Sequence, residues 1–261
     1  MRTCPDLALF LRLPLRDKLE TFLEEDEVER VPAIESGCPL VDLRAFDSQE
    51  TLRFHPSMEV FLYRKEAAIR LLEAGWNLVD LGFRLEICET YRPYPKQKRI
   101  YDQVWLETKQ RLPDLTDDQI RKEVTPFIAD PEVSPPHLSG GAVDLRLRDL
   151  DGNLVDMGAD ILTFHERSHL LAAGIEPAAL AHRKLLLMAM LHADFAPLPS
   201  EWWHYSYGDK YWGAFHNRFV KRPPLLAELS DVGNEDNAVQ HGDSKQGNEP
   251  DRRRNTEGQA A

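Results

Sequence analysis

Cysteine is scarce in this chain: Cys4, Cys38 and Cys88 are the only three among 261 residues. An odd number of widely separated cysteines, with no CxxC motif, is typical neither of a disulfide framework nor of a thiolate zinc cluster. We therefore expect reduced thiols. If the protein binds a metal ion, we expect ligands of another kind.

A surplus of basic residues is also missing. The 44 Asp and Glu residues outnumber the 32 Lys and Arg residues, which gives a formal net charge of -12 at pH 7. Binding to nucleic acid or to an anionic membrane surface needs clustered positive charge that neutralises phosphates. The composition therefore argues against nucleic acid and membrane as partners and favours a small molecule.

Long hydrophobic runs are absent as well. No stretch approaches the roughly 20 apolar residues that cross a bilayer. The apolar run over residues 7–11 is followed by Arg12 and Arg16, without the small-residue cleavage site of a signal peptide. We expect a cytoplasmic protein.

Apolar residues become rare near the C-terminus. Residues 229–261 are mostly acidic, amide, glycine and arginine residues, and such a composition cannot offset the entropy cost of ordering. We expect a disordered tail there, and an N-terminal arm over residues 1–35, where an apolar start meets an acidic segment. Residues 36–228 are long enough for a single domain with a full core.

The patterning of residues 36–228 predicts mixed secondary structure. Apolar spacing predicts three helices, over 58–74, 96–110 and 177–194, with Gly75 ending the first. Alternation predicts three strands, over 82–90, 142–147 and 200–207, and Asp151-Gly152 indicates a hairpin that continues into 153–157. Dense prolines before His137 exclude a helix there and predict a rigid, extended loop.

Residues that can bind a metal gather in two short segments. The first runs from His137 to Asp144, with two glycines between them, and the second is Glu201-Trp202-Trp203-His204. Two imidazoles and a carboxylate fill three positions of a tetrahedral zinc ion and leave the fourth for water, as in catalytic rather than structural sites. We therefore predict that His137, Asp144 and His204 bind one Zn²⁺ per chain.

Two further residues fit the chemistry of such a site. Zinc lowers the pKa of its bound water from about 16 to near 7, which provides hydroxide to attack an amide carbonyl. Glu201 is the candidate general base, and later the acid for the leaving amine. Arg92, at the end of the strand predicted over 82–90, is the candidate for stabilising charge on the carbonyl oxygen. A regular strand would separate Glu201 from His204, so we expect a bulge between them.

These motifs, with Tyr91-Arg92-Pro93 upstream, resemble those of the zinc D-alanyl-D-alanine dipeptidases, whose superfamily includes D,D-carboxypeptidases and the hedgehog signalling domain. The resemblance covers residues 41–222. It implies an α+β fold in which an antiparallel sheet carries the zinc and packs against helices, and it implies hydrolysis of D-Ala-D-Ala. By motif position it assigns the zinc ligands, the base and the transition-state arginine to the residues named above.

The chain departs from the family pattern at two positions. Pro135 stands where the family commonly has serine, two residues before the first ligand. Leu162 stands where the dipeptidases have an aspartate that binds the amine of the substrate, and the nearby Asp160 is our candidate for that role. We expect the zinc chemistry to survive this change, whereas the identity of the substrate is put in question.

Three other interpretations compete with a dipeptidase. The segment His165-Glu166-Arg167-Ser168-His169 matches the HExxH motif of zincins, although Ala172 breaks the metzincin extension. A D,D-carboxypeptidase or endopeptidase acting on peptidoglycan would use the same predicted site. A non-catalytic zinc module that binds a protein partner would need neither Glu201 nor Arg92.

Overall fold

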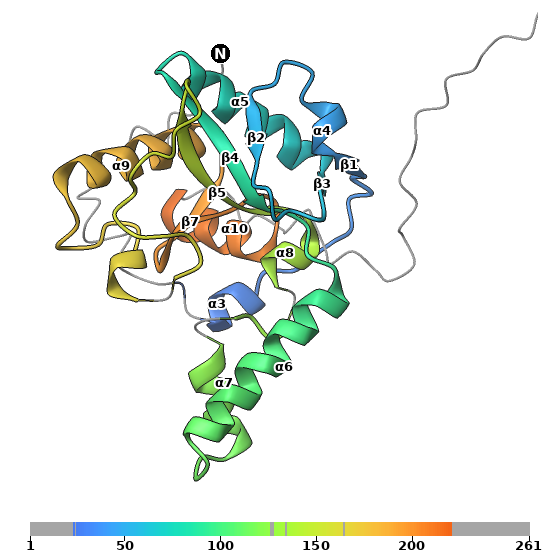
Figure 1. The fold of residues 1–261 in the computed structure, drawn as a ribbon. Helices are drawn as coiled ribbons and strands as arrows, with labels where there is room; N and C mark the ends of the chain where they lie inside the picture. The colour runs from blue at the N-terminus through green and yellow to red at the C-terminus, as the bar shows by residue number, and fades with distance from the viewer. Residues whose placement is uncertain (1–22, 24, 126–127, 134, 164, 221–261) are drawn as a thin grey trace, which may run out of the picture.

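A mixed five-stranded sheet forms the centre of the molecule in a computed structural model, which describes residues 23, 25–125, 128–133, 135–163 and 165–220 (Figure 1). Its order is β2 (Leu52–Phe54), β4 (Phe83–Glu89), β5 (Ala142–Asp149), β7 (Glu201–Ser206) and β6 (Ala196–Leu198). Only the β2–β4 pair is parallel. A second, two-stranded sheet pairs β1 (Leu40–Asp42) with β3 (Leu62–Arg64). The predicted α+β class with an antiparallel-rich sheet is confirmed.

The residues of strand β5 show that the two faces of the sheet differ. Val143, Leu145 and Leu147 are fully buried in the main hydrophobic core, whereas the alternating positions hold charged side chains, from Asp144 to Arg146. Because successive side chains of a strand point to opposite faces, one face of the sheet packs against helices while the other is left for polar groups. The predicted site residue Asp144 lies on this polar face.

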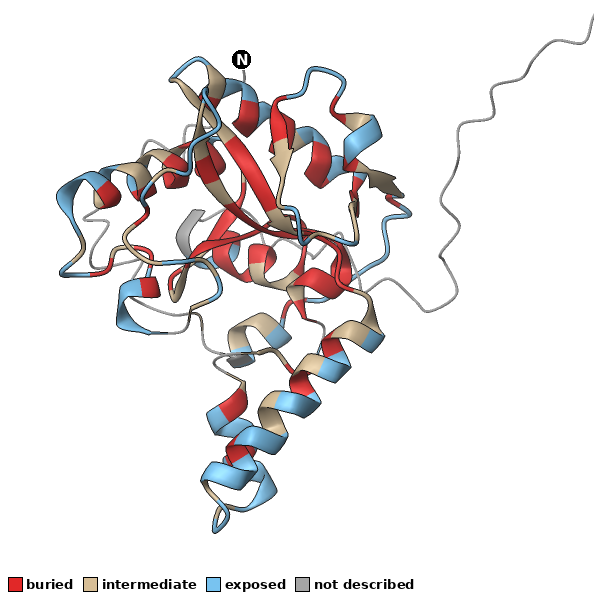
Figure 2. Cartoon of the chain, in the orientation of Figure 1, coloured by how far each residue is buried: buried red, intermediate tan, exposed pale blue. Residues whose placement is uncertain are grey.

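Two long helices cover the apolar face. Helices α5 (Lys65–Val79) and α9 (Pro177–His192) contact each other as well as strands β4 and β5, and Figure 2 shows their buried sides turned to the sheet. The helix predicted over 58–74 was wrong at both ends, because β3 occupies Leu62–Arg64 and α5 continues past Gly75. Gly75 is buried against Thr51 and Leu52, and this packing outweighs its low helix propensity.

Helices α6 (Tyr94–Arg111) and α7 (Asp117–Val124) form a pair that projects from the sheet (Figure 1). The pair has a small apolar cluster of its own around Tyr101, Ile120 and Val124. A capping box between Thr116 and Gln119 begins α7, which satisfies backbone N–H groups at the helix start. The strand predicted over 82–90, the helix over 96–110 and the helix over 177–194 correspond to β4, α6 and α9.

Two local predictions need correction. Residues 136–139 form the one-turn helix α8 (Pro136–Ser139), not an extended loop, because a proline at the first helical position gives up an N–H group that has no helical partner anyway. The hairpin after β5 closes with only an isolated bridge between Arg148 and Leu154, so residues 153–157 are not a strand.

The remaining elements are short: α3 (Glu25–Glu29), α4 (Leu43–Phe46), η1 (Glu166–Ser168), α10 (Lys210–Phe215) and η2 (His216–Val220). The predicted tail over 229–261 lies outside the described residues, as does most of the arm predicted over 1–35. Within the described part of the chain, none of the helices has the length and apolar character that a membrane crossing requires.

Candidate active site

Three adjacent strands place polar side chains side by side. Asp144 on β5 lies opposite His204 on β7, and on its other side it pairs with Glu89 on β4, next to a register shift. His137 comes from α8, which precedes β5 by two glycines. Residues far apart in the sequence therefore meet at the end of the polar face.

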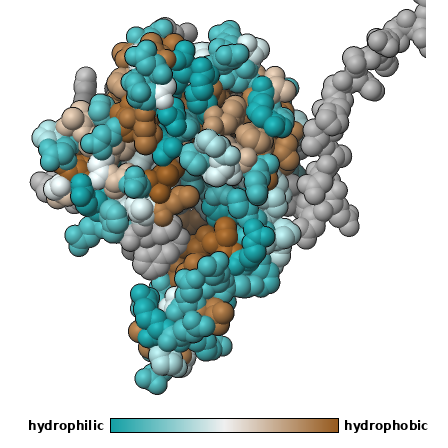
Figure 3. All heavy atoms as spheres, in the orientation of Figure 1, coloured by the Kyte–Doolittle hydropathy of each residue, from teal (hydrophilic) through white to brown (hydrophobic). Residues whose placement is uncertain are grey.

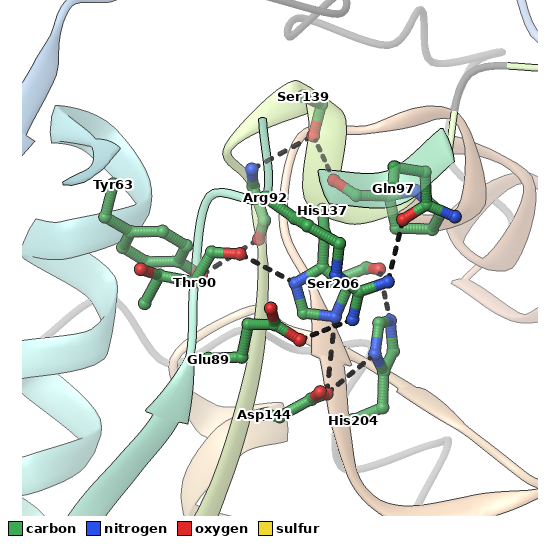
Figure 4. A network of polar contacts seen from close by, with 12 residues as sticks. Tyr63, Glu89, Thr90, Arg92, Gln97, His137, Ser139, Asp144, His204 and Ser206 are labelled. Atoms are coloured by element: carbon green, nitrogen blue, oxygen red, sulfur yellow. Dashed lines mark hydrogen bonds and ion pairs between the residues drawn. The ribbon is translucent and has the colours of Figure 1, made fainter. Parts of the chain in front are cut away.

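The three predicted metal ligands converge. Oδ1 of Asp144 lies 3.4 Å from Nε2 of His137 and 3.0 Å from Nδ1 of His204, and Figure 4 shows both imidazoles directed toward this carboxylate. One ligand atom from each residue lies within 4.8 Å of the other two. Ligands in tetrahedral zinc sites are about 3.4 Å apart, as bond lengths near 2.1 Å require. Two imidazoles and one carboxylate are also a donor set that zinc accepts.

Each imidazole is oriented by a second contact. Nδ1 of His137 donates to the backbone carbonyl of Thr90 at 2.7 Å, which directs Nε2 of the same ring toward Asp144. Nε2 of His204 lies 3.5 Å from Oγ of Ser206, so its Nδ1 is the atom available for the metal. Such contacts fix the tautomer and the ring orientation of metal-binding histidines.

The connection from His137 to Asp144 favours glycine at position 140. Gly140 has a φ of +73°, and a Cβ atom there would lie 2.9 Å from Cδ2 of Leu40 and 3.2 Å from Cγ of Arg64. A larger residue would be strained by the left-handed conformation and would displace these two side chains. The hydroxyl of Tyr63 then holds the chain by donating to the Gly141 carbonyl at 2.9 Å.

An irregularity in the β6–β7 pairing brings Glu201 to the same side as His204. Pro197 pairs with Tyr205, but the next residue, Leu198, pairs with Glu201. Residues 202–204 are thus extra on β7, which is the bulge expected from the spacing of the two polar residues. Glu201 and His204 both line one cavity.

Burial governs the electrostatics of the two acidic residues. It raises the pKa of the Glu201 carboxyl group to about 7; Asp144 adds to this effect, whereas His204 and Arg92 oppose it. Burial also acts to raise the pKa of Asp144, but the charge of His137 and hydrogen bonds from both histidines outweigh it and hold that pKa well below the ordinary value. Asp144 is therefore a permanent anion, and Glu201 can exchange a proton near neutral pH.

Arg92 is held rigidly at the edge of the same cavity. Its side chain is buried, with Nη1 donating to Oε1 of Gln97 at 2.7 Å and Nη2 paired with Glu89. Its Nε has no hydrogen-bond partner, and its backbone N–H donates to the His137 carbonyl at 3.1 Å. The guanidinium is thus positioned beside the metal-binding group before any substrate arrives.

The cavity has a volume of about 660 Å³ and is lined by all five residues predicted to act in catalysis or metal binding: Arg92, His137, Asp144, Glu201 and His204. The structure does not bring Asp160 there. Asp160 is exposed and lines a neighbouring cavity with Arg146 and Trp202. Leu162 lines the main cavity instead.

The zincin interpretation was wrong. Residues 166–168 form a short 3₁₀ helix, not an α-helix that would place two histidines one turn apart. Nδ1 of His165 accepts a hydrogen bond from the Arg167 backbone N–H, so His165 caps this turn. Among the described residues, only His137, Asp144 and His204 form a group that could hold a metal ion.

Sequence reasoning missed the residues that support the site. Glu89 and Gln97 hold the Arg92 guanidinium, and the Thr90 carbonyl orients His137. Glu89 could have been found from its position three residues before Arg92 at a strand end. Gln97 and Thr90 carry no comparable signal, because their contacts depend on how α6 and β4 pack around the site.

The site has the parts that a metallopeptidase needs: a candidate metal-binding group, a buried carboxyl group and a fixed guanidinium in one cavity. A family model described as D-ala-D-ala dipeptidase matches residues 50–222, and the chain belongs to this family. It is similar to three proteins named D-alanyl-D-alanine dipeptidase. Identity is 36% with that of Escherichia coli, over 53% of this chain and 63% of that protein. Identity is 28% with that of Synechocystis, over 72% of this chain and 89% of that protein. It is 32% with that of Enterococcus faecalis, over 56% of this chain and 73% of that protein.

Proposed function

We propose that this protein is a zinc-dependent dipeptidase that hydrolyses D-alanyl-D-alanine or a closely related dipeptide. One observation supports this most directly. A group of two imidazoles and one carboxylate shares a single cavity with a buried carboxyl group whose pKa is raised to about 7 and with a fixed guanidinium. Zinc binding alone would need only the two imidazoles and the carboxylate. The buried carboxyl group of Glu201 and the guanidinium of Arg92 therefore favour a catalytic function.

Each residue has a role that follows from its surroundings. His137, Asp144 and His204 would hold the zinc ion, which supplies an activated water and polarises the carbonyl of the peptide bond. Glu201 would take the proton of the attacking water and deliver it to the nitrogen of the leaving amine. Arg92 would donate from its guanidinium to the carbonyl oxygen, on which negative charge develops. Because Glu89 and Gln97 hold Arg92 in place, little reorganisation is needed during the reaction.

The partner that this site requires is a small dipeptide, which a cavity of this size can enclose. The catalytic unit is proposed to span residues 36–228, because the family match and the site residues fall within that range. The cytoplasmic location expected from the sequence stays a prediction.

Metal analysis combined with a substrate panel tests this function. Purified protein is expected to contain one zinc per chain and to hydrolyse D,D dipeptides faster than L,D and L,L dipeptides. Chelation should abolish hydrolysis, and added zinc should restore it. A preference for longer, amino-blocked peptides ending in D-Ala-D-Ala would instead indicate a D,D-carboxypeptidase. Zinc binding without hydrolysis of any peptide would indicate a non-catalytic module.

A further inference from the structure

Leu162 is unusual among the residues that line the active-site cavity. Its side chain is 50% exposed although it is large and apolar, and it belongs to the same cavity as the metal-binding group. Its φ is +61°, a left-handed conformation that is unfavourable for a leucine. Exposure and strain at one position of an active site indicate a functional constraint.

Hydrogen bonds build the turn that presents Leu162. Oγ1 of Thr163 donates to the Asp160 carbonyl at 2.6 Å, which closes the turn across Leu162. Oγ of Ser168 donates in turn to the Thr163 carbonyl. The strained conformation is therefore held by contacts on both sides of the residue.

Arg183 on α9 fixes the loop that contains this turn. Its fully buried guanidinium donates to the carbonyl of Met157 at 2.6 Å, of Arg167 at 2.8 Å and of His169 at 2.5 Å. The first of these carbonyls precedes Leu162 and the other two follow it. The position of Leu162 is thus determined by the folded core and does not depend on a substrate.

The surroundings of Leu162 in the cavity include further apolar groups. Ile128, Ala129, Pro135 and Leu198 line the same cavity, and Figure 3 shows apolar side chains around the hollow where the α6–α7 pair meets the rest of the molecule. The metal-binding group and Glu201 supply the polar part of the lining. A substrate bound at the metal therefore has an apolar surface within the same enclosure.

We propose that Leu162 is a specificity-determining residue that contacts an apolar side chain, larger than a methyl group, on one residue of the dipeptide substrate. This inference rests on the proposed function and narrows its substrate class. Each methylene group buried in an apolar site changes selectivity by roughly 10- to 200-fold. An alanine methyl group offers less apolar surface than a leucine or valine side chain to this lining.

A panel of five D,D dipeptides tests this inference: D-Ala-D-Ala, D-Val-D-Ala, D-Leu-D-Ala, D-Ala-D-Val and D-Ala-D-Leu. The zinc-loaded enzyme is expected to prefer a leucine-containing peptide over D-Ala-D-Ala by about 10-fold or more in kcat/KM. In Leu162→Ala this ratio should fall by about 10-fold. Leu81→Ala, which truncates a leucine that is 58% exposed in the turn after α5, should keep the wild-type ratio.

Two outcomes would overturn the inference while leaving the proposed function intact. One is hydrolysis of D-Ala-D-Ala in preference to all four larger peptides. The other is an unchanged ratio in Leu162→Ala. If that variant fails to fold, Leu162→Gly replaces it, because glycine adopts the left-handed conformation without strain. Failure of the wild-type enzyme to cleave any of the five peptides would overturn the proposed function itself.

Discussion

Asp144 and His204 lie directly opposite each other on β5 and β7, with 3.0 Å between Oδ1 of the aspartate and Nδ1 of the histidine. Two of the three predicted metal ligands are therefore placed by the register of the sheet. A slip of one residue would turn one side chain of the pair to the opposite face. The apolar partners on the same strands, such as Val143 and Tyr205, make that slip costly because they are fully buried.

Replacement of Glu201 should separate metal binding from catalysis. Glu201→Gln keeps the size of the side chain but cannot accept a proton, so kcat should fall by roughly 10²- to 10⁴-fold. The zinc content should stay at one per chain, because Glu201 is not part of the metal-binding group. Metal analysis and turnover of the same sample check both statements. Wild-type turnover in this variant would contradict the role of the base.

Loss of the Arg92 guanidinium should act mainly on kcat. Arg92→Ala is expected to lower kcat by roughly 10²- to 10³-fold, as removal of one oxyanion donor does. Arg92→Lys should not restore activity, since a single ammonium group cannot reproduce the fork that contacts both Glu89 and Gln97. An effect confined to KM would show that Arg92 binds the ground state and the transition state equally.

Glu86 should make the stability of the protein dependent on pH. Its carboxylate is buried between Arg146 and Arg148. Burial acts to raise its pKa, but the two arginines outweigh this and hold the pKa below the ordinary value of 4.5. A carboxyl group whose pKa is lowered by folding stabilises the folded state at pH values above its ordinary pKa. This stabilisation is lost as the pH falls through the folded-state pKa.

Glu86→Gln tests this dependence. The wild-type free energy of unfolding should exceed that of the variant near neutral pH, and the difference should shrink as the pH falls below about 4.5 and through the folded-state pKa. Urea unfolding at several pH values measures it. A difference that stays constant over this range would show that the ion pairs do not link stability to protonation.

Arg183 should be important for stability as well as for the cavity. Arg183→Met fills a similar volume but leaves three carbonyls without their donor, of which that of Met157 is buried and those of Arg167 and His169 are part-buried. A buried acceptor without a donor costs about 1–3 kcal/mol, so we expect a loss of about 2 kcal/mol or more in urea unfolding. Arg183→Lys should recover little of this, because one ammonium group cannot reach all three carbonyls. A loss below about 1 kcal/mol would contradict the role of these hydrogen bonds.

The sequence predicted the convergence of His137, Asp144 and His204 better than it predicted their surroundings. These three residues stood out as a candidate metal-binding group because their chemistry is specific and their segments carry recognisable spacing. The bulge between Glu201 and His204 followed from the two-residue period of a strand. These inferences depend on local pattern, which is fully present in the sequence.

The errors arose where distant packing decides the structure. The sequence predicts that Gly75 ends a helix, but its burial against β2 lets α5 continue. It offers Asp160 for substrate binding because this carboxylate lies near the position of the family's aspartate, whereas the structure places Leu162 in the cavity and Asp160 in a neighbouring one. Neither outcome follows from the neighbouring residues alone. Both depend on contacts with elements far away in the sequence.

The anchorage of the loop by Arg183 has a consequence for substitutions at position 162. Arg183 holds the loop through the backbone carbonyls of residues 157, 167 and 169, so the anchorage does not involve the side chain of residue 162. The candidate metal-binding residues lie on different segments, on β5, β7 and α8. A substitution at position 162 therefore changes the lining of the cavity while the backbone hydrogen bonds to Arg183 and the candidate metal-binding residues stay in place.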